Sequence, residues 1–148
     1  MEPDLYYQKA DEKDIDFLLD LRMKTMNPHY TESNLPTDRE TTLQRILYRF
    51  DKAHIIFLHH QPVGLLKINR TDEKTEVLQL QILPDLQGRG LGKKILKDIL
   101  DEASVSGKTV TLSVLKTNKA QHLYSRLGFR IVGEDQYSYF MEFPGKDM

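Results

Sequence analysis

Apolar residues recur along this 148-residue chain with two spacings, and these spacings predict its secondary structure. Short apolar or alternating runs predict strands at residues 5–9, 53–59, 63–70, 76–83, 109–115, 130–133 and 137–143. Apolar residues three and four positions apart predict helices that begin after Asp11, after a capping box at Thr37–Glu40, at Leu91 and after Asn118.

Turn residues separate these elements. We expect His60-Gln61-Pro62 to join two strands and Thr71–Thr75 to form a polar turn. Gly107 and Gly128 follow apolar helical runs and should end those helices. Residues 27–38 have the least regular pattern in the chain.

The predicted order of elements is β-α-α-β-β-β-α-β-α-β-β. It predicts an α/β (α+β) fold in which a mixed, mostly antiparallel sheet carries helices on both faces. A chain of 148 residues is large enough for one hydrophobic core, so residues 1–148 should form a single domain.

Composition narrows the class of protein. Hydrophobic residues make up 39% and charged residues 29% of the chain, and the formal net charge is −1, so we expect no general attraction to nucleic acid or to anionic membranes. The longest purely aliphatic or aromatic run, Ile55–Leu58, is far too short to cross a bilayer. The chain has no cysteine, and its acidic start lacks the apolar core of a signal peptide, so a cytoplasmic location is expected.

The segment Gln87-Gly88-Arg89-Gly90-Leu91-Gly92 carries the strongest functional signal. It lies between an apolar strand and a helix, where backbone N–H groups and the helix dipole can bind phosphate. The glycine spacing does not fit G-x-G-x-x-G of dinucleotide-binding proteins. It also does not fit a P-loop, since Gln87 stands where the first glycine belongs and Lys94 replaces the Ser/Thr.

The pattern that fits is Q-x-x-G-x-G at Gln87, Gly90 and Gly92. It resembles the pyrophosphate-binding signature of the GNAT superfamily of N-acetyltransferases. The resemblance covers about residues 53–143 and includes Asn118, Tyr124 and the sequence Leu127-Gly128-Phe129 in the family's order. It implies the GNAT fold, acetyl-CoA as co-substrate without a metal, and transfer of the acetyl group to a primary amine.

The resemblance also implies which residues bind coenzyme A. The backbone of Ile82 and Leu83 should pair with the pantetheine amides, and Asn118 should bind the pantetheine arm or serve as a plain helix cap. Phosphate contacts are expected from the backbone of residues 87–92, with Arg89 and Lys93 as cations. The predicted contact set at the turn is Gln87, Gly88, Arg89, Gly90, Leu91, Gly92 and Lys93.

The implied reaction is direct attack of an amine on the thioester through a tetrahedral intermediate. Tyr124 occupies the position of the family's proton donor to the leaving thiolate, although it could instead be a packing residue. A phenol is a weaker acid than a thiol, so we expect Tyr124 to donate a hydrogen bond or to have a lowered pKa. Glu76 lies where some members carry a catalytic base; a water chain, with Glu76 merely solvated, is the alternative.

The acceptor site is implied by the resemblance only in outline. It should include Arg22, Met26, His29, Tyr30 and Tyr137. Arg22 could hold a carboxylate, but the sequence does not choose between a small-molecule amine and a peptide amine. The sequence leaves three alternative functions open: a non-catalytic acyl-CoA-binding or sensing protein, a transferase of a longer acyl group, and a phosphate-binding module unrelated to coenzyme A. It also leaves open a homodimer through the last hairpin.

Overall fold

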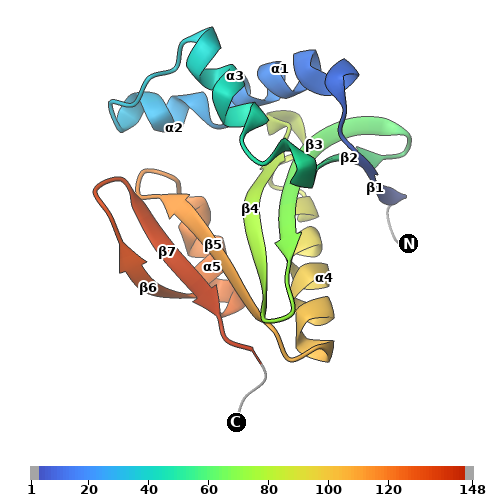
Figure 1. Cartoon of the computed structure of the whole chain (residues 1–148), viewed down its shortest axis with the longest axis vertical. Coiled ribbons are helices and arrows are strands. Elements are labelled where there is room, and N and C mark those ends of the chain that lie inside the picture. Colours follow the sequence, from blue (N-terminus) through green and yellow to red (C-terminus); the bar gives the residue numbers. More distant parts are fainter. Residues whose placement is uncertain (1–3, 146–148) are drawn as a thin grey trace. The chain divides into compact units, whose positions relative to one another are not determined.

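The computed structural model describes residues 4–145 and contains one seven-stranded sheet with helices. Figure 1 shows its elements, which follow in the order β1 (Leu5–Lys9), α1 (Ile15–Thr25), α2 (Asn27–Glu32), α3 (Arg39–Leu47), β2 (Ala53–Leu58), β3 (Gln61–Arg70), β4 (Lys74–Ile82), α4 (Leu91–Val105), β5 (Thr109–Leu115), α5 (Ala120–Leu127), β6 (Arg130–Glu134) and β7 (Ser138–Phe143). The strand order is β1-β2-β3-β4-β5-β7-β6. β4 and β5 are parallel, whereas β1–β2, β2–β3, β5–β7 and β6–β7 are antiparallel, so the mixed sheet is confirmed.

The chain forms two compact units. Within the described residues, the first unit comprises the chain up to Lys67 together with Gln79–Arg89. The second comprises Ile68–Leu78 and the chain from Gly90 onward. β3 and β4 therefore contribute residues to both units.

Helices α1 and α3 build the core of the first unit with strands β2 and β3. Their apolar positions recur at helical spacing, and the residues packed together include Leu18, Leu21, Ile46, Ile55 and Leu65, all at most 1% exposed. Leu83, at the end of β4, packs against the same cluster. Burial of these side chains supplies the main driving force for this half of the fold.

The chain before α1 is capped as the sequence suggests. Asp11 accepts a hydrogen bond from the Lys13 N–H at 3.0 Å, and the Asp14 side chain accepts one from the Asp11 N–H at 2.9 Å. These reciprocal bonds satisfy N–H groups that a helix start leaves without partners. The prediction of Asp11 as a cap is confirmed.

Two predictions between α1 and β2 were wrong. The predicted order has two helices before β2, whereas the structure adds a third, the short α2, which has a proline in its first turn, where no N–H is needed. The expected capping box at Thr37–Glu40 does not form, because Asp38 is the cap and accepts from the Thr41 N–H at 3.1 Å. That bond holds the pKa of the Asp38 carboxyl below its usual value.

The turn between β2 and β3 was also predicted wrongly. The two-residue connection is His59-His60, with φ of 50° and 68°, as a tight hairpin of this length requires. Gln61 and Pro62 belong to β3. A register irregularity opposite Pro62, between Ile56 and Phe57, accommodates a residue that has no N–H to donate.

In the second unit, α4 begins at Leu91 and ends before Gly107, as the sequence predicts. Its buried positions lie on one face and are Leu91, Ile95, Leu96, Ile99, Leu100 and Ala103. Gly107 (φ 69°) and Gly128 (φ 112°) follow α4 and α5 in the left-handed conformation, so both predicted helix ends are confirmed. α5 lies behind β5 and β7 in Figure 1.

Strands β5, β6 and β7 complete the second unit. β4 pairs with β5 in parallel from Lys74↔Thr109 to Val77↔Leu112. β6, at the end of the strand order, pairs with β7 through a bulge: Ile131 lies opposite Met141 and Gly133 opposite Phe140, which leaves Val132 as the extra residue.

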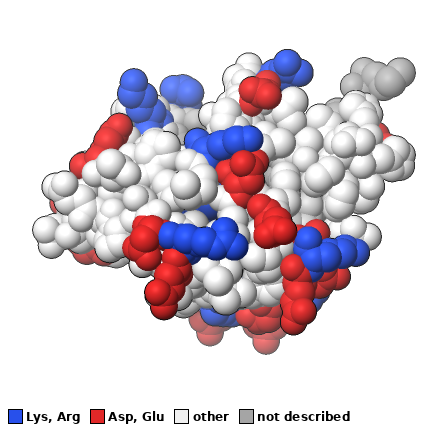
Figure 2. Space-filling view, turned by 90° about the horizontal axis from the view of Figure 1, so that it is seen from above, with Lys and Arg blue, Asp and Glu red and all other residues white. Residues whose placement is uncertain are grey.

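The charged surface is mixed in sign. Figure 2 shows acidic and basic side chains interspersed over one face rather than gathered into a patch of a single sign. None of the helices in the described part of the chain is long and apolar enough to cross a membrane.

Candidate active site

The end of β4 is tied to the turn that follows it. The Gln87 side chain donates from Nε2 to the Ile82 carbonyl at 2.8 Å, and the Leu86 N–H donates to the Leu83 carbonyl at 2.9 Å. Gly88 has φ of 80°, a conformation that favours glycine. The first residue of the signature, Gln87, therefore shapes the turn through its side chain.

Hydrogen bonds within the protein already use backbone groups that were predicted to bind pantetheine. The Leu83 N–H donates to the Val63 carbonyl at 2.9 Å, and its carbonyl accepts from Leu86. Both backbone groups of Leu83 thus have protein partners. The Ile82 carbonyl likewise has a partner in the Gln87 side chain, so the strand-like pairing of Ile82 and Leu83 with the pantetheine amides stays a prediction.

The start of α4 leaves backbone donors without helical partners. Gly90 precedes the helix with φ of 81° and provides no side-chain cap. The first helical bond runs from the Lys94 N–H to the Gly90 carbonyl at 2.9 Å, so the N–H groups of Leu91, Gly92 and Lys93 precede the regular ladder. A donor set of this kind, at the positive end of a 15-residue helix, suits an anion.

The glycines of the turn also leave room for a ligand. A Cβ atom built on Gly88, Gly90 or Gly92 would meet no atom within 4 Å. Arg89 and Lys93 are exposed, and within residues 4–145 neither forms an ion pair, whereas Lys94 pairs with Asp98 at 3.1 Å. The turn therefore combines open space, backbone donors and two available cations, a set that fits a diphosphate.

Asn118 stands before α5 in the second unit. Its Oδ1 accepts a hydrogen bond from the Ala120 N–H at 2.9 Å, so the capping role that the sequence left open is present. In the described part of the chain, its Nδ2 donates to no other residue. Asn118 can therefore cap the helix and still offer a donor to a ligand.

Tyr124 lies in the second turn of α5. Its ring centroid is 5.9 Å from that of Phe129, and the ring planes are tilted by 59°. Burial raises the pKa of its hydroxyl, because removal from water disfavours the phenolate. Of the two expectations for Tyr124, this favours a neutral hydrogen-bond donor over a phenol with lowered pKa.

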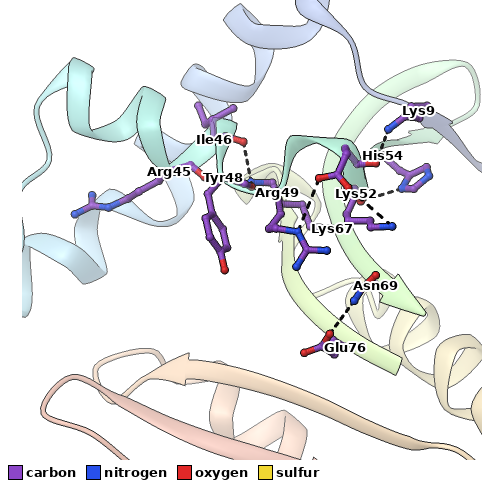
Figure 3. Close-up of polar contacts among 11 residues, drawn as sticks. Lys9, Arg45, Ile46, Tyr48, Arg49, Lys52, His54, Lys67, Asn69 and Glu76 are labelled. Carbon is purple, nitrogen blue, oxygen red and sulfur yellow. Dashed lines mark hydrogen bonds and ion pairs between the residues drawn. The ribbon is translucent and has the colours of Figure 1, made fainter. Parts of the chain in front are cut away.

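Glu76 lies on β4 in the second unit, and each of its two carboxylate oxygens contacts another side chain. Oε1 accepts from the Asn69 Nδ2 at 2.8 Å, as Figure 3 shows, and Oε2 lies 3.6 Å from the Lys74 Nζ. Its side chain is 28% exposed. Glu76 is thus fixed in position at a partly open place on the strand. Among the described residues, no group of three or more acidic or histidine side chains is arranged to hold a metal ion.

Residues predicted for the acceptor site fall in both units. Arg22 and Tyr30 contact each other in the first unit: the Arg22 Nη2 donates to the Tyr30 hydroxyl at 2.9 Å. Met26 ends α1, and its carbonyl accepts from the N–H groups of His29 and Tyr30 at 3.0 and 3.1 Å. Tyr137 belongs to the second unit, where its N–H donates to the Asp135 carboxylate at 2.9 Å.

The first unit also buries a lysine for which the sequence predicted no role. The ammonium of Lys67, which is 0% exposed, donates to the carbonyls of Arg45, Ile46 and Tyr48 at 3.1, 2.8 and 2.6 Å and so closes the end of α3 (Figure 3). A lysine within the apolar run Val63–Ile68 was the signal that could have identified it. Burial first, and then the charge of Arg22, lower the pKa of Lys67 to about 8.

Two glutamines on β4 remain without the cross-sheet bonds that such residues could make. Both side-chain amide atoms of Gln81, and Oε1 of Gln79, are buried with no hydrogen-bond partner in residues 4–145. Alternate residues of a strand share a face, so the two amides lie on the same side of β4. Buried polar atoms without partners are rare and call for a physical reason.

A comparison with protein families gives one extended match. A family model described as an acetyltransferase (GNAT) domain matches residues 33–143, which include the turn, Asn118 and Tyr124. The curated L-amino acid N-acyltransferase MnaT of Escherichia coli (strain K12) is 42% identical over 53 residues, or 34% of this chain and 31% of that protein. The chain thus matches about a third of the length of this relative.

Solved structures share the fold over nearly the whole chain. The PaiA N-acetyltransferase of Thermoplasma acidophilum, solved with coenzyme A, covers 95% of this chain and 99% of its own at a TM-score of 0.72 and 16% identity. Arabidopsis thaliana Naa50, solved with the bisubstrate analogue CoA-Ac-MVNAL, covers 93% and 97% at a TM-score of 0.63 and 16% identity. At 16% sequence identity, these similarities show a shared fold and nothing more.

Proposed function

Because this chain belongs to the GNAT family of acetyltransferases, we propose that it transfers an acetyl group from acetyl-CoA to a primary amine. Family membership and its curated N-acyltransferase relative make it an acyltransferase. The observation that carries the finer proposal is the turn before α4, where open glycines, free helical N–H groups and two exposed cations suit the diphosphate of coenzyme A.

Bound acetyl-CoA would supply the thioester that the amine attacks directly through a tetrahedral intermediate. In the proposal, Arg89, Lys93 and the N–H groups at the start of α4 bind the phosphates, and the free Nδ2 of Asn118 orients the pantetheine arm. These contacts place the co-substrate before the amine arrives, and positioning of this kind contributes much of the rate of a two-substrate reaction.

Tyr124 is proposed to hydrogen-bond the departing sulfur. Its raised pKa keeps the phenol neutral, and a neutral phenol is a donor. Proton transfer from a phenol to a thiolate is uphill by roughly 2 kcal/mol for ordinary pKa values. Burial makes full transfer still less favourable, so a strong hydrogen bond is the role that we assign.

The amine must lose a proton before it attacks, because an alkylamine with a pKa near 10.4 is almost entirely protonated at pH 7. Glu76, fixed by Asn69 and Lys74, is one candidate acceptor for this proton. A water chain that leads to solvent is the other. The MnaT and Naa50 comparisons support a small-molecule or peptide amine as the acceptor.

A charge placed at Gly92 would test the coenzyme site. Gly92→Glu adds a carboxylate where a Cβ meets nothing within 4 Å, and an acidic residue in the first helical turn is compatible with the helix dipole. We expect unchanged or higher thermal stability but at least tenfold weaker binding of acetyl-CoA in calorimetry. Gly92→Gln is the matched control for size, and it should bind more tightly than the glutamate variant. Equal affinity of the two variants would contradict phosphate binding at this turn.

A measurement of turnover distinguishes an enzyme from a non-catalytic sensor of the same fold. Release of free thiol from acetyl-CoA, followed over a panel of primary amines, should exceed the rate without amine. Tight binding of acetyl-CoA without amine-dependent thiol release would instead support the sensing alternative. Faster release from a longer acyl-CoA would revise the acyl group.

A further inference from the structure

Two cations are buried close together in the first unit without a carboxylate. Arg22 of α1 is 1% exposed and Lys67 of β3 is 0% exposed. Across residues 4–145, neither forms an ion pair with an acidic side chain, and each is within the electrostatic influence of another cation. A buried charge is normally paired or neutralised, because its removal from water is unfavourable.

The two cations differ in how well their donors are satisfied. Lys67 uses its ammonium fully on three carbonyls at the end of α3. Arg22 has one bond, from Nη2 to the Tyr30 hydroxyl, whereas its Nε and Nη1 are buried with no partner. The guanidinium therefore keeps N–H groups on two nitrogens for an acceptor that the protein itself does not provide.

Tyr30 holds this guanidinium in place. The Arg22 Cζ lies 5.2 Å from the centre of the Tyr30 ring, and the Arg45 Cζ lies 4.0 Å from the same centre. Two cations at one aromatic ring add to the positive potential around Arg22. A neutral acceptor such as water could satisfy the free N–H groups, but only an anion would also compensate this charge.

We propose that Arg22, positioned by Tyr30, binds the carboxylate of the amine acceptor, so that the preferred acceptors are amino acids or similar amines with a carboxylate close to the amine. The inference rests on the proposed acyltransferase function and specifies its substrate class. A planar guanidinium matches a carboxylate in geometry and forms charge-assisted hydrogen bonds with it. In the proposal, the carboxylate approaches Arg22, which is 1% exposed, beside the partly exposed Tyr30; the Tyr30 hydroxyl keeps its bond to Nη2, and Nε and Nη1 donate to the carboxylate.

The position of Arg22 agrees with an acceptor role. Leu18 and Leu21 precede it on α1 and belong to the same packed cluster as Leu83, the residue that follows β4. Helix α1, which carries Arg22, and the residue after β4 thus contribute to one packed cluster within the first unit. The phosphates of coenzyme A have separate donors in the turn, which leaves Arg22 for the second substrate.

The first test uses the unaltered protein. Thiol release from acetyl-CoA is measured with matched pairs of acceptors, namely an amino acid, its amide and its decarboxylated amine, across several side chains. For the preferred side chain we expect kcat/KM about 10- to 100-fold higher with the carboxylate than with either analogue, the range that hydrogen bonds to charged groups give. Equal values for all three would overturn the inference while leaving the transferase proposal intact.

Variants then assign the preference to one side chain. Arg22→Met should remove the 10- to 100-fold preference for the carboxylate over both analogues, whereas Arg22→Lys should retain part of it. Arg39→Met is the matched control, since Arg39 is an exposed arginine of α3 and its loss changes the net charge equally. A preference that survives in Arg22→Met would refute the assignment.

A binding measurement decides the question even if no amine is turned over. In protein labelled with ¹⁵N-arginine, the Nε signal that Arg22→Met removes should shift with an N-acetyl amino acid and not with its amide. A shift with inorganic phosphate alone would overturn the carboxylate assignment. Absence of thiol release with every amine would refute the transferase proposal, and a carboxylate-dependent shift in that case would still establish the binding site.

Discussion

The buried ammonium of Lys67 should make the stability of this protein rise at alkaline pH. The perturbation is Lys67→Met, which keeps a side chain of similar length and removes the charge. Lys67 is 0% exposed and has a pKa of about 8, lowered from 10.5 by burial and by Arg22. The variant also removes three hydrogen bonds at the end of α3, but that loss is present at every pH below the one at which Lys67 releases its proton.

The sign follows from proton linkage. Below pH 8 both the folded and the unfolded chain carry the ammonium, so the unfavourable burial of the charge is fully present. Between about pH 8 and 10.5 the unfolded chain binds one more proton at Lys67 than the folded chain, and the free energy of unfolding rises with pH. At 1.36 kcal/mol per pKa unit, the full lowering corresponds to about 3 kcal/mol.

The assay is urea unfolding of the wild type and of Lys67→Met at a series of values from pH 7 to 10.5. Titration of other groups is common to both proteins and cancels in the difference. We expect the wild type to gain about 3 kcal/mol relative to the variant over this range. Lys97→Met, at an exposed position of α4, reports the effect of losing a surface lysine.

The reasoning would be refuted if the two unfolding free energies stayed parallel throughout this range. A direct titration of the Lys67 ε-carbon by NMR in the wild type provides an independent check. A midpoint near that of an ordinary lysine would show that the three carbonyls compensate fully for burial.

Three further predictions concern the active site and the sheet. Tyr124→Phe should lower kcat tenfold or more with little change in KM for acetyl-CoA, because the hydrogen bond to sulfur forms as it departs; an unaltered kcat in steady-state kinetics would end this assignment. Glu76→Gln should reduce kcat/KM about 100-fold if the carboxylate is the base, whereas a kcat/KM like that of the wild type would favour the water chain. Gly64→Ala should destabilise the fold by about 1–3 kcal/mol in urea unfolding, because its Cβ would lie 2.2 Å from the Gln81 carbonyl oxygen; a wild-type midpoint would refute this.

Local signals explain what the sequence predicted well. Helix α4 was placed within its observed bounds because an apolar stripe runs between glycines at both ends. Asn118 and Gly128 were likewise assigned from residues that act within one turn of a helix. The pyrophosphate turn could be found because its six residues are contiguous.

Signals that depend on distant contacts were missed or misplaced. Pro62 suggested a turn, but hairpin geometry put the turn at His59-His60. The surroundings of Arg22 could not be predicted, because Tyr30 and Lys67 come from α2 and β3, and only folding brings them to the same guanidinium. The sequence did show Arg22 among the apolar positions of α1, which marks a charge that will be buried.

The extra residue in β6 has a consequence for solubility. An unpaired edge strand offers a regular row of donors and acceptors to which a strand of another molecule can add. Val132 interrupts that row, although it and Ile131 expose apolar side chains, at 58% and 50%. Deleting Val132 would make the edge regular, and we expect the shortened protein to aggregate at concentrations where the parent chain stays dispersed, which light scattering would reveal.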